Sequence, residues 1–357
     1  MSAKSMLITG GAGFIGTNAA EAFIHDGWRV IIFDNLSRAG TNVNLQWLLD
    51  RFPAQCEFVR GDIRFDRPVL NRLAARCDAV LHLAAQVAVT SSVVNPEEDF
   101  EINARGTLNV LEAIRQAPVP PRLIYASTNK VYGSLENVAL VRDTTRYRAT
   151  AMPNGISEEQ PLDFHSPYGC SKGAADQYVR DYNRIYRIPT VVFRQSCIYG
   201  PHQFGIEDQG WVAWFTIAAL LGKPVTIYGD GLQVRDVLHV HDLVRAYQLA
   251  LENPFVMQGG IYNIGGGPEN TVSVLELVYQ LEARLGTKVA MAFAEPRPGD
   301  QRIFVSDVRK LKWDLGWKPE ISPDFGVETL VQWAHEHMDV LQPVLYAEPA
   351  LEESQHV

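Results

Sequence analysis

A glycine-rich turn near the start of the chain limits the possible folds more than any other feature. The turn, TGGAGFIG over residues 9–16, follows an apolar run and opens an amphipathic stretch. Its glycines fall at Gly10, Gly13 and Gly16, where the missing side chains permit a tight turn and the close approach of a pyrophosphate. The helix that starts at Phe14 and Ile15 would offer unpaired N–H groups to the phosphates. The turn predicts a dinucleotide-binding site, with a tight turn that holds no ligand as the alternative.

An acidic residue at the end of the second apolar run supports the dinucleotide interpretation. Asp34 stands in the segment IIFDN, residues 31–35, where a carboxylate accepts hydrogen bonds from the adenosine ribose and repels a 2′-phosphate. This favours NAD over NADP. Arg38 lies four residues further on and either weakens that exclusion or lies over the adenine, and we favour the second interpretation. Asn35 and Ser37 belong to the same predicted cofactor segment.

The first half of the chain alternates apolar runs with amphipathic stretches, which is the βαβ pattern of a parallel sheet. We expect strands at 5–9, 29–33, 57–60, 79–83, 122–126 and 190–193, and helices at 14–25, 102–116 and 171–186. After residue 193, prolines and glycines separate short segments, of which 260–264 is expected to return to the main sheet. The predicted fold is a Rossmann-type α/β doubly wound parallel sheet with a smaller α+β substrate-binding region. Its parts are a cofactor domain at 1–193 with returning segments near 236–265, a substrate region at 194–346, and a mobile tail at 347–357.

Charge and apolar content exclude several classes of function. The net charge is −9, and no run of Lys or Arg is longer than two, so the chain lacks the positive field that nucleic acid or an anionic membrane requires. An anionic substrate must instead be held by a few placed arginines. No window approaches the ~18 apolar residues of a membrane span, and the N-terminal apolar stretch is shorter than the ~7 residues of a secretory signal. We therefore expect a cytoplasmic protein that binds neither nucleic acid nor membrane.

Metal and disulfide frameworks are not expected either. The four cysteines lie far apart and form no C-x-x-C pair, which fits free thiols in a reducing compartment. His239 and His241 alternate along a segment and could face one side as a metal pair does, but no third group of ligands accompanies them. We expect no metal site.

A tyrosine and a lysine four residues apart supply the candidate acid–base chemistry. Tyr168 and Lys172 stand near the start of a predicted helix, where residues four apart share one face. Because an ordinary tyrosine has a pKa of ~10, it is a poor base at neutral pH. A neighbouring ammonium and a positive nicotinamide ring would favour the phenolate and lower that pKa. Lys172 could also hold the nicotinamide ribose. Such a pair is common on protein surfaces, but its place after the fifth strand of a dinucleotide fold favours catalysis.

These features together resemble the extended short-chain dehydrogenase/reductase family, and the resemblance covers most of the chain. Its G-x-x-G-x-x-G spacing is typical of that family, and further family motifs follow in the family's order. They are GDI at 61–63, HLAAQ at 82–86, a helical asparagine at 103 and STNKVYG at 127–133. The resemblance implies that NAD is the cofactor and adds further residues to its site, namely Asp62, Ile63, Leu83, Ala84, Ala85, Gln86, Asn103 and Ser127.

The segment 127–133 discriminates between members of the family. Its match with the family pattern places the catalytic hydroxyl on Thr128, which would hydrogen-bond the substrate hydroxyl as the proton leaves. The 4,6-dehydratase members carry Asp-Glu at the next two positions and use both carboxylates to eliminate water. Asn129 and Lys130 stand there instead, so elimination lacks its acid–base pair. Oxidation followed by re-reduction, the chemistry of an epimerase, remains.

Two segments of the second half resemble the family's substrate-binding arm. In residues 233–242, Arg235 matches the arginine that clamps the diphosphate, a task suited to a planar guanidinium. Around residue 299, Arg297 matches an arginine that meets phosphate and Asp300 an aspartate that meets the nucleotide ribose. Cys197 replaces the asparagine that usually touches the diphosphate. The complete predicted substrate site is Thr128, Lys130, Gln195, Gln209, Tyr228, Arg235, Arg297, Asp300 and Arg302.

Several stretches, 163–178 above all, are similar to family members that act on CDP-hexoses. The resemblance implies a nucleotide-diphosphate-sugar epimerase that inverts C2 of a CDP-hexose through a transient 2-keto sugar, with NAD bound throughout. A 4-epimerase, a 4,6-dehydratase, a net oxidoreductase and a binding protein without turnover remain as alternatives. The residues do not identify the nucleotide base or the deoxygenation pattern of the sugar. Family dimers pair the helices expected at 102–116 and 171–186, so we expect a homodimer or homotetramer.

Overall fold

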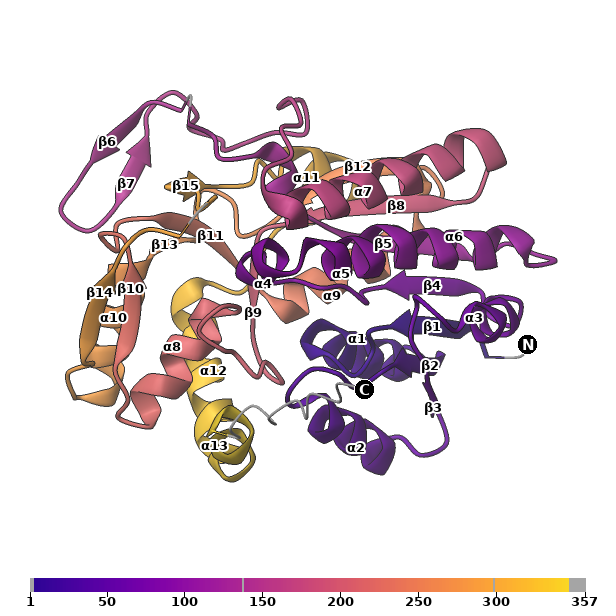
Figure 1. The fold of residues 1–357 in the computed structure, drawn as a ribbon, viewed down its shortest axis with the longest axis horizontal. Coiled ribbons are helices and arrows are strands. Elements are labelled where there is room, and N and C mark those ends of the chain that lie inside the picture. Colours follow the sequence, from indigo (N-terminus) through magenta and orange to yellow (C-terminus); the bar gives the residue numbers. More distant parts are fainter. Residues whose placement is uncertain (1–2, 137, 298, 347–357) are drawn as a thin grey trace, which may run out of the picture.

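The computed structural model describes residues 3–136, 138–297 and 299–346, and its centre is a seven-stranded sheet (Figure 1). All neighbouring strands are parallel, in the order β12-β8-β5-β4-β1-β2-β3. The strands are β1 (Ser5–Thr9), β2 (Arg29–Asp34), β3 (Cys56–Arg60), β4 (Ala79–His82), β5 (Arg122–Thr128), β8 (Thr190–Gln195) and β12 (Gln258–Ile264). The predicted Rossmann-type sheet is confirmed, and the segment 260–264 does return to it. The tail at 347–357 lies outside the described residues.

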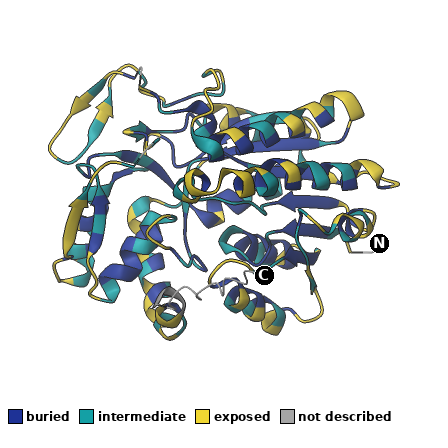
Figure 2. Cartoon of the chain, in the orientation of Figure 1, coloured by how far each residue is buried: buried dark blue, intermediate teal, exposed yellow. Residues whose placement is uncertain are grey.

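Helices cover both faces of this sheet, and Figure 2 shows the strands as the buried middle layer. One core cluster joins one face to α1 (Phe14–His25), α2 (Thr41–Arg51), α9 (Val240–Glu252) and α11 (Arg309–Leu315). A second joins the opposite face to α3 (Arg67–Ala74), α6 (Gly106–Gln116) and α7 (Ser166–Tyr186). Because both faces are covered, the strands are apolar without alternation. In β1, for example, Met6 and Ile8 pack into the first cluster and Leu7 into the second.

The smaller region is built from short strands and helices around its own apolar cluster, which includes Phe215, Val225 and Leu281. Its strands form a parallel pair, β10 with β14, and a mixed sheet in which β11 contacts β9, β13 and β15. An antiparallel hairpin, β6 with β7, projects beside it (Figure 1). The bounds are β6 (Leu140–Arg142), β7 (Tyr147–Ala149), β9 (Cys197–Tyr199), β10 (Val225–Tyr228), β11 (Val234–His239), β13 (Thr271–Ser273), β14 (Met291–Ala294), β15 (Ile303–Phe304), α8 (Trp211–Leu220), α10 (Val274–Leu285), α12 (Pro323–Glu336) and α13 (Met338–Tyr346).

The starts of two helices differ from those that the sequence predicted, since α7 starts earlier and α6 starts later, at Gly106 rather than 102. α7 begins at Ser166 rather than 171, because Pro167 occupies the first turn, where its missing N–H costs no helical hydrogen bond. Ahead of α6 lie the short helices α4 (Val89–Val94) and α5 (Pro96–Phe100) and a π-helical turn, η1 (Glu101–Arg105). Within the described ranges, none of the helices has the length and apolar character needed to cross a bilayer.

Candidate active site

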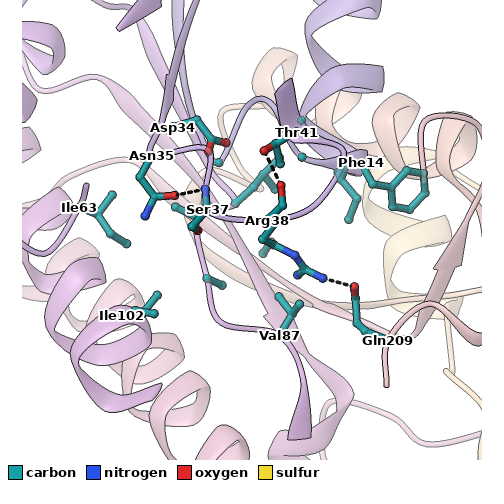
Figure 3. Close-up of a pocket in the computed structure, with 18 of the residues that line it drawn as sticks. Phe14, Asp34, Asn35, Ser37, Arg38, Thr41, Ile63, Val87, Ile102 and Gln209 are labelled. Carbon is teal, nitrogen blue, oxygen red and sulfur yellow. Dashed lines mark hydrogen bonds between the residues drawn. The ribbon is translucent and has the colours of Figure 1, made fainter. Parts of the chain in front are cut away.

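A pocket lies along the carboxyl ends of β1, β2 and β4 and continues to the start of α7. Figure 3 shows part of its lining. In parallel α/β sheets this edge is where ligands bind. Most predicted cofactor residues line it together, although they come from six separate segments. They are Gly10, Gly13, Phe14, Ile15, Gly16, Asp34, Asn35, Ser37, Arg38, Asp62, Ile63, Leu83, Ala84, Ala85, Ser127, Tyr168 and Lys172.

The glycine turn has no room for side chains. Gly10 has a φ of +69°, and a Cβ built there would lie 2.7 Å from the amide nitrogen of Ala84. A Cβ on Gly16 would lie 2.6 Å from the carbonyl oxygen of Gly10. Both positions therefore require glycine, and the turn packs directly on the loop after β4. The backbone at the start of α1 stays open to the pocket, as phosphate binding there requires.

Hydrogen bonds hold Asp34 at the edge of the pocket. One carboxylate oxygen accepts from the backbone N–H of Ala12 at 3.1 Å, and the other accepts from that of Leu36 at 2.8 Å. Burial raises the pKa of Asp34 above its usual value, and the two backbone donors oppose that rise. The carboxylate therefore has a fixed orientation in which it can meet a ribose. Asp62 accepts a hydrogen bond from the Asn35 side chain at 2.8 Å, which links the ends of β2 and β3.

A loop of the smaller region covers the pocket from the other side, and its lining residues His202, Gln203 and Phe204 were not predicted. Asn44 of α2 also lines the pocket and donates to the carbonyl oxygen of His202 at 3.1 Å. The sequence shows only a Gly-Pro pair at 200–201 as a sign of this loop. Contacts between positions 158 residues apart leave no pattern in a single sequence.

The side chains of Arg38 and Gln209 point toward each other across the pocket in Figure 3 and are hydrogen-bonded. Arg38 belongs to the loop after β2, and Gln209 belongs to the loop that leads into α8. The hydrogen bond therefore connects the part of the chain that forms the seven-stranded sheet, the cofactor half, to the smaller region. Gln209, which we predicted to contact substrate, lines the cofactor pocket as well.

Gln86 and Asn103, two further predicted cofactor residues, lie beside the pocket rather than in its lining. The Asn103 side-chain oxygen accepts from the backbone N–H of Gln86 at 2.9 Å, and its amide donates to the Ser171 hydroxyl at 3.1 Å. Asn103 is fully buried. Its position suits a residue that fixes the loop after β4 against α7.

The three predicted catalytic residues come together at the end of the pocket. Thr128 ends β5, while Tyr168 and Lys172 occupy the first two turns of α7. Burial raises the pKa of Tyr168 to about 12, and a hydrogen bond with Thr128 opposes that rise. Burial also lowers the pKa of Lys172 to about 7. The protein groups alone thus do not lower the tyrosine pKa, because burial outweighs the other influences, and the predicted lowering also requires the positive nicotinamide ring of a bound cofactor. The Lys172 ammonium donates to the carbonyl oxygen of Ala126 at 2.6 Å.

A buried ion pair supports this catalytic segment from behind. Asp176, one turn after Lys172, pairs with Arg194 of β8 at 3.0 Å and accepts a hydrogen bond from Ser127 at 2.8 Å. Arg194 also donates to the Tyr132 hydroxyl at 2.9 Å. The sequence did not predict this network, which fixes β5, α7 and β8 relative to one another.

The predicted substrate arm lies on the far side of the triad. Arg235 pairs with Asp300 at 2.6 Å, and Lys130 lies 3.8 Å from the same carboxylate. Arg297 pairs with Asp208 at 2.8 Å and lies 3.8 Å over the ring of Tyr228, which was also predicted.

Other predicted substrate residues are placed differently. Gln195 lines the cofactor pocket and donates to the Tyr247 hydroxyl. Arg302 is exposed, and its guanidinium lies over Tyr147 of the hairpin. Cys197, the unusual replacement, is a free thiol that accepts a hydrogen bond from the Trp211 indole at 3.0 Å, and burial raises its pKa to about 12. Among the described residues, no group of three or more His, Cys, Asp or Glu is placed to hold a metal ion.

Comparison with known proteins gives consistent matches over most of the chain. A family model, the NAD dependent epimerase/dehydratase family, matches residues 6–265. CDP-paratose 2-epimerase of Salmonella typhi is 47% identical over 336 residues, which are 92% of this chain and 98% of that enzyme.

Solved structures of similar proteins agree with this match. UDP-glucose 4-epimerase of Thermotoga maritima, solved with UDP-glucose, is 32% identical with a TM-score of 0.79, and the alignment covers 94% of this chain and 99% of that one. dTDP-glucose 4,6-dehydratase of Streptomyces venezuelae, solved with NAD, is 30% identical with a TM-score of 0.82, covering 95% and 99%.

Proposed function

The chain belongs to the NAD-dependent epimerase/dehydratase family, and we propose that within it the protein inverts one carbon of a nucleotide-diphosphate sugar. The carbon proposed is C2 of a CDP-linked hexose, and the intermediate is a 2-keto sugar. One observation carries the reaction type. Thr128, Tyr168 and Lys172 meet at the end of a dinucleotide pocket, while Asn129 and Lys130 stand where elimination would need two carboxylates.

The triad can perform both halves of an epimerisation. Tyr168, as the phenolate, removes the proton of the sugar hydroxyl while Thr128 hydrogen-bonds the same oxygen. When bound, NAD supplies a reversible hydride acceptor for the hydrogen of that carbon and a positive ring that favours the phenolate. Lys172 also lines the pocket and would hold the nicotinamide ribose when NAD is bound. Tyr168 then returns its proton as the hydride comes back to the opposite face of the ketone, so no net oxidation results.

Two observations favour C2 of a CDP-hexose over C4. The relative that is 47% identical over nearly its whole length is named CDP-paratose 2-epimerase, whereas the structurally similar 4-epimerase is 32% identical. Cys197 also replaces the asparagine found in 4-epimerases, and Trp211 holds its thiol. A sugar bound there loses one amide contact to its diphosphate and is free to take another position.

The test is incubation with CDP-, UDP- and GDP-hexoses, followed by identification of products by NMR. A C2-inverted CDP-hexose, formed without accumulation of reduced nicotinamide, is the expected result. Product inverted at C4 with C2 retained would refute the 2-epimerase assignment and leave the family assignment intact. A dehydrated product, or steady growth of reduced nicotinamide absorbance, would instead identify a dehydratase or a net oxidoreductase.

Assembly through the helices on one face of the sheet is a further part of the proposal. α7 exposes Tyr178, Ile185 and Tyr186, and the neighbouring α5 exposes Phe100. α5, α6 and α7 lie next to one another on the same face of the sheet (Figure 1). A two-fold axis beside these helices would bury that apolar surface, which supports a homodimer or a pair of dimers. Light scattering that gives a monomer mass at micromolar concentration would contradict it. The four cysteines are free thiols, which supports the proposal that the protein functions in the reducing environment of the cytoplasm.

A further inference from the structure

The substrate side of the triad holds more positive than negative charge. Lys130 and Arg235 share a single carboxylate, that of Asp300, at 3.8 Å and 2.6 Å. Neither cation is at the open surface, because their side chains are 18% and 13% exposed. Two cations around one carboxylate leave a net positive charge in a partly desolvated place. An anionic group in contact with both would compensate it.

Lys130 is tied to the catalytic segment itself. Its backbone N–H donates to the Thr128 hydroxyl at 3.2 Å, so the lysine side chain starts two residues from the triad. The ammonium donates to the carbonyl oxygen of Gly299 at 3.2 Å. An ammonium has three donors, and this bond uses one. Burial, with Arg235 as the second cause, lowers the pKa of Lys130 to about 8, and Asp300 opposes that shift.

The position of this ammonium matters because of how a nucleotide sugar is built. The anomeric carbon C1 carries the β-phosphate, C2 is bonded directly to C1, and C4 lies on the opposite side of the ring. A sugar with C2 at Tyr168 and Thr128 must therefore bring its β-phosphate close to the triad. A sugar with C4 there holds its phosphate a full ring-width away. Only the first arrangement brings the phosphate toward the segment that follows Thr128. Lys130 belongs to that segment, and its ammonium lies 3.8 Å from the Asp300 carboxylate that Arg235 also contacts.

We propose that Lys130 binds the β-phosphate of the nucleotide sugar, next to Arg235, and so selects C2 rather than C4 for oxidation. This rests on the proposed function, because it concerns the substrate of that same site. Lys130 is then a specificity-determining residue at the position where a dehydratase carries a catalytic carboxylate. The competing role is purely structural, in which Lys130 fastens the arm through Gly299 and touches no substrate.

The two roles make different predictions for nucleotides with and without a β-phosphate. We would measure the affinities of CDP and CMP by calorimetry, using the NAD-loaded enzyme, for wild type, Lys130→Met and Lys130→Arg. The matched control is Lys310→Met, because Lys310 also donates to a backbone carbonyl, that of Ile261 at 2.6 Å, but lies on α11. UDP and UMP would serve as a second pair.

Lys130→Met should weaken diphosphate binding by roughly 10- to 100-fold, the range for a lost charged hydrogen bond, and leave monophosphate binding within about twofold. Lys130→Arg should restore much of the loss, and Lys310→Met should change neither affinity. Equal weakening of CDP and CMP, or none, would overturn the proposal, as would a wild type that binds both nucleotides equally. The calorimetry reports contact with the β-phosphate and the NMR analysis reports which carbon is inverted, so a failure here is distinguishable from a failure of the proposed reaction.

Discussion

The cofactor half and the substrate half of this molecule differ in how their sites relate to the order of the chain. Around the cofactor pocket, Gly10, Asp34 and Asp62 stand at the carboxyl ends of three strands that lie side by side in one parallel sheet. On the substrate side, Lys130, Arg235 and Asp300 come from a short helix, a strand of another sheet and a loop. A regular sheet places consecutive strand ends at one edge, whereas the second site exists only through contacts between distant segments.

This difference predicts that substituting a buried residue of the sheet half mainly lowers the free energy of unfolding. Asp176 is buried, and its pair with Arg194 ties α7 to β8. Asp176→Asn leaves the Arg194 charge without its partner, which should lower the free energy of unfolding by about 3–5 kcal/mol. Denaturant unfolding would measure it. Asp143→Asn is the control, since the Asp143–Arg148 pair of the hairpin is exposed and such surface pairs contribute little to stability. Equal effects of the two substitutions would contradict the comparison.

The triad lies where the halves meet, so a substitution there should affect turnover without affecting either half. Tyr168→Phe removes only the phenolic oxygen and should reduce kcat at least ~100-fold, the scale of a lost general acid–base group. Bound NAD and the unfolding midpoint should stay close to those of wild type. Single-turnover kinetics and cofactor release after denaturation would check both. Near-normal turnover would remove Tyr168 from the mechanism.

The preference for NAD over NADP depends on Asp34, which belongs to the sheet half. Wild-type enzyme, when denatured, should release NAD, because the Asp34 carboxylate would repel a 2′-phosphate. Asp34→Ala should reduce the preference for NAD over NADP by roughly 10- to 100-fold, as expected for loss of a close like-charge contact. Competition binding of the two dinucleotides measures the ratio. Release of mainly NADP from wild type would show that Asp34 does not control the choice.

The features that the sequence could predict lie mainly in the cofactor half. The glycine turn, Asp34 and the Tyr-x-x-x-Lys pair depend on local spacing within one strand–turn–helix unit, and local spacing is visible in a sequence. Helix starts were misplaced by several residues, because Pro167 is equally compatible with a loop and with a first helical turn.

The parts that the sequence did not predict are long-range. The Asp176–Arg194 pair and the cover formed by residues 202–204 depend on how separate segments pack, and neither has a periodic pattern. The pKa that Tyr168 has without a cofactor was not predicted, for a related reason. Burial is a property of the assembled site, and it raises the pKa of Tyr168 more than neighbouring groups lower it.

The smallest expected effect concerns one hydrogen bond, between the side chains of Arg38 and Gln209, which joins the two halves across the pocket (Figure 3). Gln209→Ala removes the acceptor but leaves Arg38, the lining backbone and the triad in place. Because a hydrogen bond to a charged group at an exposed position contributes modestly, NAD should dissociate about 2- to 10-fold faster. Gln46→Ala is the matched control, since Gln46 bonds Asp50 within α2 and connects nothing across the pocket. Stopped-flow displacement of NAD would measure both rates. If the two glutamine variants release NAD at the wild-type rate, the halves are held together by the packing of residues 201–205 on α1 and α2, and the bond across the pocket has no part in retaining the cofactor.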